Sequence, residues 1–193
     1  PTGGGKSICY QIPALVKEGI CIVISPLVAL MKDQTIKLQK RNIKAIAITG
    51  GLNQHELDIA LDNCIYGNIK LLYVSPERLE SDLVRERIKK MNVNLIAVDE
   101  AHCISQWGYD FRPSYLKIAE IRALKPDSPI LALTATATKK VVKDIQDKLL
   151  FKKHNVILNS FKRANLAYMV LEESHKSTRV QKILQKIKGP AII

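Results

Sequence analysis

The first seven residues of the chain, Pro1-Thr2-Gly3-Gly4-Gly5-Lys6-Ser7, match most of a phosphate-binding loop. The full pattern is G-x-x-x-x-G-K-[ST], and its first position would lie before residue 1. Glycines let the backbone close tightly enough for its N–H groups to point at phosphate oxygens. Lys6 would bring charge to the β- and γ-phosphates of ATP, and the Ser7 hydroxyl is a ligand for Mg²⁺. The predicted nucleotide-binding residues are Thr2, Gly3, Gly4, Gly5, Lys6 and Ser7. Because a chance glycine turn could produce so short a match, a second element is needed.

That second element is a pair of acids, Asp99 and Glu100, directly after the apolar run Leu95–Val98. The carboxyl ends of strands in a parallel sheet gather around bound ligands. Asp99 can hold Mg²⁺ there, directly or through water, and Glu100 can orient and deprotonate an attacking water. The alternative is an ordinary solvated strand end, but a phosphate loop upstream favours a site for Mg-ATP.

Apolar, β-branched runs alternate with amphipathic stretches through most of the chain. The predicted strands are Ile20–Ile24, Ala45–Ile48, Leu71–Val74, Leu95–Val98 and Ile130–Leu133. The predicted helices are Ile8–Lys17, Leu27–Gln39, Gln54–Cys64, Leu83–Lys90, Tyr115–Leu124 and Lys139–Leu149. Nearly continuous apolar strands indicate a sheet covered on both faces. The alternation predicts an α/β fold with a doubly wound, mainly parallel sheet of the P-loop type, whose first strand would lie before Pro1. Pro13 is expected to kink or end the first helix.

The pattern changes after Asn155. Short strands are predicted at Val156–Leu158 and Ala167–Leu171, followed by a polar linker, a helix at Thr178–Ile187 and a strand beginning at Ala191. We therefore expect a first domain over residues 1–172, and a linker with the start of a second domain over residues 173–193.

Composition restricts the class of protein. Hydrophobic residues make up 47% of the 193 residues, so a sizeable core can form. No apolar run approaches the roughly 20 residues of a membrane span, and no leader follows Pro1, so a soluble intracellular protein without a membrane partner is expected. Three of the four cysteines lie in apolar stretches and none forms a CxxC pair, which favours reduced thiols and no zinc site.

The net charge of +12 is concentrated in the second half of the chain. Residues 101–193 hold 17 Lys or Arg and 7 Asp or Glu, which leaves only +2 for the first hundred residues. Such a concentration suits a polyanionic partner such as nucleic acid. A solubilising lysine-rich surface explains the charge equally well.

Five ordered motifs resemble those of RecQ-type DNA helicases. Asp99-Glu100-Ala101-His102 resembles the box of DEAH helicases of superfamily two, and Cys103–Pro113 resembles the aromatic-rich loop that follows it in RecQ proteins. Residues 25–34 resemble motif Ia, residues 73–79 the Ib region and residues 131–138 motif III, while residues 160–166 are similar to the segment that leaves the first motor domain. Val28 in place of Ile and Ala164 in place of Pro are mild departures. The resemblance covers essentially the whole chain and implies a RecA-like first motor domain.

The resemblance implies roles for residues of the two groups. The ATPase residues would be Lys6, Ser7, Asp99 and Glu100, with His102 as a relay to a second domain. The residues that contact DNA, or couple it to hydrolysis, would be Pro26, Lys32, Gln106, Trp107, Phe111, Arg112, Thr134 and Thr136. Bases stack on aromatic rings with about 1–3 kcal/mol each and without sequence preference, and an Arg adds a phosphate or cation–π contact.

Several of these residues could instead have purely structural roles or simply be solvated. Trp107, the only Trp, could be a core or loop anchor, and Lys32 could be merely solvated. Thr134 and Thr136 could instead cap the helix that begins near Thr138.

For the whole protein, the resemblance implies ATP-driven 3′–5′ movement on single-stranded DNA and duplex unwinding in repair and recombination. A second RecA-like domain would supply an arginine finger, which can contribute about 10³–10⁵ in rate. The chain alone is therefore expected to hydrolyse ATP poorly. The alternatives are an RNA helicase or other translocase, and a P-loop switch protein that does not act on nucleic acid.

Overall fold

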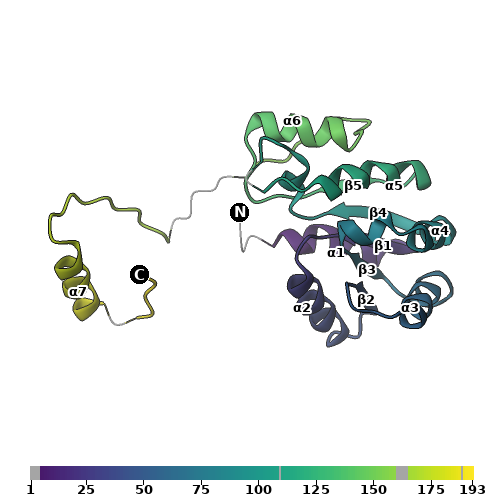
Figure 1. Ribbon diagram of the computed structural model, residues 1–193, viewed down its shortest axis with the longest axis horizontal. Coiled ribbons are helices and arrows are strands. Elements are labelled where there is room, and N and C mark those ends of the chain that lie inside the picture. The colour runs from purple at the N-terminus through teal and green to yellow at the C-terminus, as the bar shows by residue number, and fades with distance from the viewer. Residues whose placement is uncertain (1–4, 109, 160–164, 188) are drawn as a thin grey trace. The chain divides into compact units, whose positions relative to one another are not determined.

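The computed structural model describes residues 5–108, 110–159, 165–187 and 189–193 (Figure 1). The chain forms two compact units, Pro1–Asn159 and Ser160–Ile193. The domain boundary expected at residue 172 stays a prediction. The boundary between the two compact units falls earlier, after Asn159. In the described part of the chain, no helix combines the length and apolar character needed to cross a membrane.

The first unit is built on one parallel five-stranded sheet in the order β2-β3-β1-β4-β5. Its strands are β1 (Ile20–Ile24), β2 (Ala45–Ile48), β3 (Leu71–Val74), β4 (Val93–Val98) and β5 (Ile130–Ala132). The central strand β1 is buried along its whole length, whereas the edge strand β5 is half-buried throughout. Alternate side chains of β1 belong to two separate hydrophobic cores, one on each face of the sheet.

Helices cover both faces of the sheet, as a doubly wound fold requires. On one face, α1 (Lys6–Val16) and α2 (Val28–Gln39) pack Tyr10 and Met31 against β1 and β3. The other face is covered by α3 (Gln54–Tyr66), α4 (Asp82–Lys90), α5 (Ile118–Leu124) and α6 (Lys139–Lys148). Short 3₁₀ turns lie at Pro76–Glu80, Ala101–Ile104 and Pro113–Lys117. The predicted α/β fold with a doubly wound parallel sheet is confirmed.

Several predicted boundaries differ from those of the structure. Pro13 does not end α1, which continues to Val16 while the Lys17 N–H donates to the Pro13 carbonyl at 3.2 Å. The predicted helix at 115–124 is a 3₁₀ turn followed by α5, and the strand predicted at Ile130–Leu133 stops at Ala132.

The strands predicted at 156–158 and 167–171 are wrong, because these segments have no regular secondary structure. Ile157 and Val170 are fully exposed. A β-branched run forms a strand only where a neighbouring strand and a packed face receive it. In the described part of the second unit, α7 (Lys176–Lys186) has no buried residue, and Ala191–Ile193 forms no strand.

Candidate active site

The predicted acids lie at the carboxyl edge of the sheet, where β4 ends. The Asp99 N–H donates to the Ile24 carbonyl at 2.8 Å, so the ladder with β1 continues one residue past β4. Glu100 then turns the chain away with φ 47° and ψ 44°, a left-handed conformation that is uncommon for a residue with a side chain. The Glu100 N–H donates to Asp99 Oδ1 at 3.0 Å, and the Ala101 N–H to the Leu133 carbonyl at 2.9 Å. These bonds hold the strained turn at the edge where both acids lie.

The end of the glycine loop meets the same edge. Gly5 precedes α1 with φ 78°, a conformation that glycine adopts without steric cost. Lys6 and Ser7 follow as the first two residues of α1, so the positive end of the helix dipole lies where phosphates are predicted. The other predicted loop residues, Thr2, Gly3 and Gly4, lie outside the described residues.

Glu100 lies between two basic groups from different elements. Lys6 Nζ donates to Glu100 Oε1 at 3.2 Å, across 94 positions of sequence. His102 Nδ1 lies 3.4 Å from the other carboxylate oxygen, Oε2. All three side chains are at most about a quarter exposed, with 22% for Lys6, 23% for Glu100 and 14% for His102. The structure thus brings three of the predicted catalytic residues into one contact.

Asp99 is the buried member of the acidic pair, with only 8% of its surface exposed. Burial raises the pKa of its carboxyl above the usual range, and the neighbouring Glu100 raises it further. A divalent cation would offset both effects, because it stabilises the ionised form. Ser25 Oγ, one residue past β1 at this edge, is buried and has no hydrogen-bond partner among the described residues. An edge with a destabilised carboxylate and an unsatisfied hydroxyl fits a hydrated Mg²⁺, which takes oxygen ligands and keeps several of its waters. Ser7 and Asp99 are the residues that would hold it.

His102 also contacts the loop after β5. Its Nδ1 lies 3.0 Å from Thr134 Oγ1. The Thr134 hydroxyl donates to the Thr136 carbonyl at 3.2 Å and accepts from the Thr136 N–H at 3.2 Å. The Thr134 hydroxyl thus lies between the His102 ring and the backbone of Thr136. Thr134 and Thr136 are therefore linked to the acidic site through His102. The residue that caps α6 is Thr138, whose hydroxyl accepts from the Val141 N–H at 3.4 Å.

The aromatic loop begins directly after His102 and reaches the surface. Trp107 is 64% exposed, so its alternative role as a core anchor is wrong. Gln106 is exposed, and Phe111 is half-buried with Lys148 Nζ 5.9 Å from its ring centroid. Gly108 allows the tight turn, because a Cβ there would lie 2.3 Å from the His102 carbonyl oxygen.

Arg112 connects the loop to the predicted motif Ia. Its guanidinium donates to Asp110 Oδ2 at 3.1 and 3.2 Å and lies 3.5 Å from the Pro26 carbonyl oxygen. Pro26 is thus brought to the loop. Lys32 is not: it is exposed on α2, and among the described residues no hydrogen bond or ion pair links it to the others.

Several residues that support the site carry no clear signal in the sequence. The buried Tyr115 hydroxyl donates to the Asp99 carbonyl at 3.0 Å. Lys140 Nζ lies 3.1 Å from the Trp107 ring centroid. Lys148 Nζ donates to the Ile104 carbonyl at 3.0 Å. Two of the three are ordinary lysines of an amphipathic helix, and their positions in α6 alone do not indicate these contacts.

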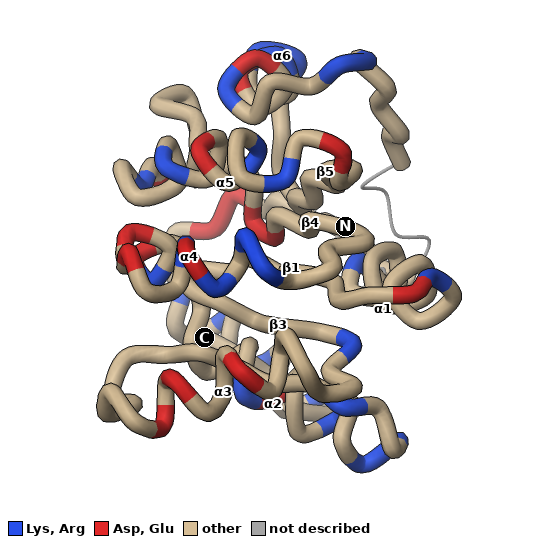
Figure 2. Tube along the Cα trace, turned by 90° about the vertical axis from the view of Figure 1, so that its right-hand side faces the viewer, with Lys and Arg blue, Asp and Glu red and all other residues tan. Residues whose placement is uncertain are grey.

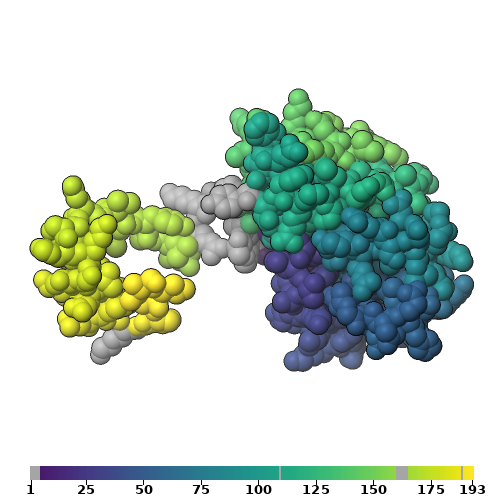
Figure 3. All heavy atoms as spheres, in the orientation of Figure 1, coloured from purple at the N-terminus to yellow at the C-terminus, as the bar shows by residue number. Residues whose placement is uncertain are grey.

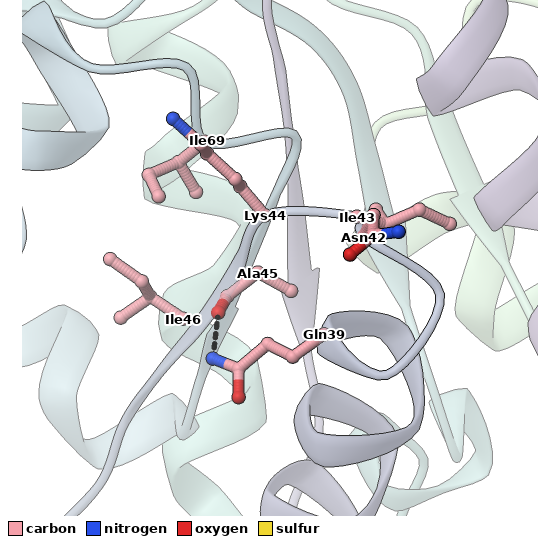
Figure 4. Close-up of a pocket in the computed structure, with 7 residues that line it drawn as sticks. All are labelled: Gln39, Asn42, Ile43, Lys44, Ala45, Ile46 and Ile69. Carbon is pink, nitrogen blue, oxygen red and sulfur yellow. Dashed lines mark hydrogen bonds between the residues drawn. The ribbon is translucent and has the colours of Figure 1, made fainter.

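The cysteines are free thiols, and one hollow of the first unit lies away from the acids. Cys21, Cys64 and Cys103 are buried, which raises the pKa of the first two thiols to about 12 and of the third to about 11, whereas Cys9 is exposed. A hollow of about 450 Å³ lies where β2 and β3 begin, with Gln39 donating to the Ala45 carbonyl at its wall (Figure 4). Its lining comes from Gln39, Asn42, Ile43, Lys44, Ala45, Ile46 and Ile69. Because it lies at the amino-terminal edge of a parallel sheet, it is opposite the acids and not part of the site.

The parallel sheet, with Lys6, Asp99, Glu100 and His102 at its carboxyl edge, places the first unit in a class of α/β domains. Domains of this class bind nucleotide phosphates at the carboxyl ends of their strands. Residues 1–145 match the DEAD/DEAH box helicase family. The chain therefore belongs to that family, and the resemblance to RecQ helicases is confirmed by its relatives.

Those relatives are longer than this chain. RecQ, an ATP-dependent DNA helicase of Bacillus subtilis, is 46% identical over 192 residues, which cover 99% of this chain and 32% of RecQ. The probable ATP-dependent DNA helicase RecS of the same organism is 41% identical over 197 residues, covering 100% of this chain and 39% of RecS. The RecQ-like DNA helicase blm-1 of Caenorhabditis elegans is 39% identical, and 20% of it is covered. The chain thus spans less than half the length of these relatives.

Solved structures show the same fold. The helicase domain of Hef from Pyrococcus furiosus matches with a TM-score of 0.57 and 23% identity, covering 78% of this chain and 32% of that one. A hypothetical ATP-dependent RNA helicase from Sulfolobus tokodaii matches with a TM-score of 0.57 and 19% identity, covering 79% and 45%. At these identities the likeness concerns the fold alone.

Proposed function

We propose that this chain is the ATP-binding first motor domain of an intracellular DNA helicase of the RecQ type. In the whole protein, hydrolysis of Mg-ATP drives 3′–5′ movement on single-stranded DNA and duplex unwinding in repair and recombination. The observation that carries the proposal is the position of Glu100 between Lys6 and His102, because the chain passes from His102 straight into the loop that exposes Trp107.

In this proposal each residue of the site has a separate role in ATP binding or hydrolysis. Lys6 and the N-terminus of α1 bind the phosphates. Ser7 and Asp99 would hold Mg²⁺, which would supply positive charge to the phosphoryl oxygens. Glu100 orients the attacking water and accepts its proton. Lys6 and Glu100 are paired at 3.2 Å, and phosphates would compete for the lysine. Binding of ATP would then release the carboxylate for its role as base.

The second group of residues links hydrolysis to DNA. Trp107 offers a face for stacking bases, and Arg112, Gln106 and Phe111 complete the loop. A shift of this loop moves His102, whose Nδ1 is bonded to Thr134 and lies near Glu100. Pro26, beside Arg112, belongs to the same surface, and Lys32 contributes a phosphate contact from α2.

Residues 1–172 form the motor domain in this proposal, and residues 173–193 lead into the second one. The relatives' greater length is consistent with a second RecA-like domain in the same protein. Without its arginine finger, the chain alone hydrolyses ATP slowly, since such a finger contributes about 10³–10⁵ in rate. The protein acts in the bacterial cytoplasm, or in the nucleus if it is eukaryotic.

The test is the ATPase rate of the full-length protein with single-stranded DNA, with single-stranded RNA and with neither, using Glu100→Gln as the blank. Stimulation by DNA alone, lost in the variant, is the expected result. Stimulation by RNA would favour an RNA helicase. Equal rates under all three conditions, or no binding to any oligonucleotide, would favour a nucleotide switch and contradict the proposal.

A further inference from the structure

The exposed face of Trp107 is in contact with a lysine from another element. Lys140 lies in the first turn of α6, and its Nζ lies 3.1 Å from the centroid of the Trp107 ring. An ammonium at this distance interacts with the negative face of the indole. It also occupies a face on which a nucleic-acid base would stack.

Lys140 is the first of three residues by which α6 contacts the aromatic loop. The other two are Asp144 and Lys148, four and eight positions further on, so all three lie on one side of the helix. Lys148 Nζ donates to the Ile104 carbonyl at 3.0 Å and lies 3.1 Å from Asp144 Oδ2. Successive turns of α6 thus lie along the loop segment from Ile104 to Trp107 and contact it.

The middle contact of this series is made by the carboxylate of Asp144, which forms an ion pair with Lys148. Partial burial raises the pKa of Asp144, but hydrogen bonds with Ser105 and Lys148 outweigh it and hold the pKa below the usual range. Ser105 is fully buried, and its Oγ accepts from the Trp107 N–H at 3.2 Å. The base of the loop is therefore anchored at Ser105 and Ile104, while the exposed indole is contacted by Lys140 at the surface.

The charge around Lys140 suits a phosphate backbone. α6 has the sequence KKVVKDIQDK, and Lys139, Lys140 and Lys143 are exposed in its first turns. Figure 2 marks the lysines of α6 in blue, and in Figure 3 the green atoms of this part of the chain form part of the outer surface of the first unit. A nucleotide whose base stacks on Trp107 brings its own phosphates close to this cluster.

We propose that Lys140 is a further DNA-contact residue, which holds the indole of Trp107 in the absence of DNA and pairs with a phosphate when a base stacks there. This inference rests on the proposed function. The exchange is favourable because an exposed cation–π contact is weak, whereas a lysine that neutralises a phosphate releases a counterion from the strand. The anchored base of the loop confines the movement to the segment carrying Trp107.

The experiment measures binding of a labelled oligothymidylate to the full-length protein at several salt concentrations. The variants are Lys140→Met, which keeps the stem of the side chain without its charge, Lys140→Arg, and Lys17→Met. Lys17 is a matched control, because it is an exposed lysine just before β1, at the opposite edge of the sheet.

We expect Lys140→Met to reduce the slope of log affinity against log salt by about 0.7, the value of one phosphate contact on a single strand. It should also raise the DNA concentration for half-maximal ATPase stimulation. Lys140→Arg should restore both, since a guanidinium can contact ring and phosphate alike, and Lys17→Met should change neither.

An unchanged slope in Lys140→Met, beside normal stimulation of the unmodified protein by DNA, would overturn this inference and leave the proposed function intact. An equal fall in Lys17→Met would also overturn it, because the effect would then be one of net charge. If the unmodified protein neither binds DNA nor responds to it, the proposed function fails as well.

Discussion

His102 and Thr134 are hydrogen-bonded although 32 positions separate them: His102 Nδ1 lies 3.0 Å from Thr134 Oγ1. His102 comes from the turn after β4, and Thr134 from the loop after β5. Because the same Nδ1 lies 3.4 Å from Glu100, this bond joins motif III to the acidic site.

Thr134→Val removes the acceptor while keeping the shape of the side chain. We expect the DNA-stimulated ATPase rate of the full-length protein to fall roughly 2- to 10-fold, the equivalent of one hydrogen bond of about 0.5–1.5 kcal/mol. Binding of single-stranded DNA should persist. The same change at the exposed Thr178 of α7 is the control, and an unaltered rate in Thr134→Val would show that the bond has no part in coupling.

Lys6→Met should weaken ATP binding by about 10- to 100-fold, because a hydrogen bond to a charged group contributes about 1.5–3 kcal/mol. Glu100→Gln should keep ATP binding and lose hydrolysis, since the amide cannot accept the proton of water. Titration with a fluorescent ATP analogue separates the two, with Lys17→Met as control. Equal affinity of Lys6→Met and the unmodified protein would contradict the phosphate assignment.

Asp99→Asn should stabilise the metal-free protein at neutral pH. The folded-state pKa of Asp99 is raised by burial and by Glu100, so ionisation opposes folding at any pH above its folded-state pKa. As the pH falls below the unfolded-state pKa, Asp99 is protonated in both states and the advantage of Asn disappears.

For Asp99→Asn, the expected gain in Tm at pH 7 is about 2–4 °C, the shift that about 1 kcal/mol produces in a domain of this size. The measurement is thermal unfolding in a chelator at pH 7 and near pH 3. Asp127→Asn, at an exposed turn, should change neither curve. A loss of Tm in Asp99→Asn at neutral pH would mean that the carboxylate is stabilised without a metal.

Gly108→Ala should displace the aromatic loop. The added Cβ would lie 2.3 Å from the His102 carbonyl oxygen and 3.0 Å from that of Ser105, and neither backbone atom can move freely. We expect a loss of about 1–3 kcal/mol in stability, as for overpacked sites, together with reduced stimulation by DNA.

Trp107 is the only Trp of the chain, so its emission spectrum reports the displacement directly. Gly50→Ala is the control, because a Cβ there meets nothing within 4 Å. An unchanged spectrum in Gly108→Ala would show that the loop absorbs the methyl group without moving Trp107.

The sequence by itself determined the fold class and the position of the acids. The strands β1, β2 and β3 have the bounds that their apolar runs predict, because a strand buried on both faces is apolar at every position. Asp99 and Glu100 could be assigned to the carboxyl edge for the same reason, since they follow such a run. These features depend on local pattern, which is readable from neighbouring residues.

Only the tertiary structure decided which residues meet. That Lys140 covers Trp107, or that Tyr115 supports Asp99, depends on how α6 and the turn at Pro113–Lys117 pack against the turn at Ala101–Ile104 that follows β4. The segments at 156–158 and 167–171 have the composition of strands and form none, because a ladder needs a partner that local sequence does not specify. Contacts between distant residues follow from the packing of whole elements, and the chemistry of this site is composed of such contacts.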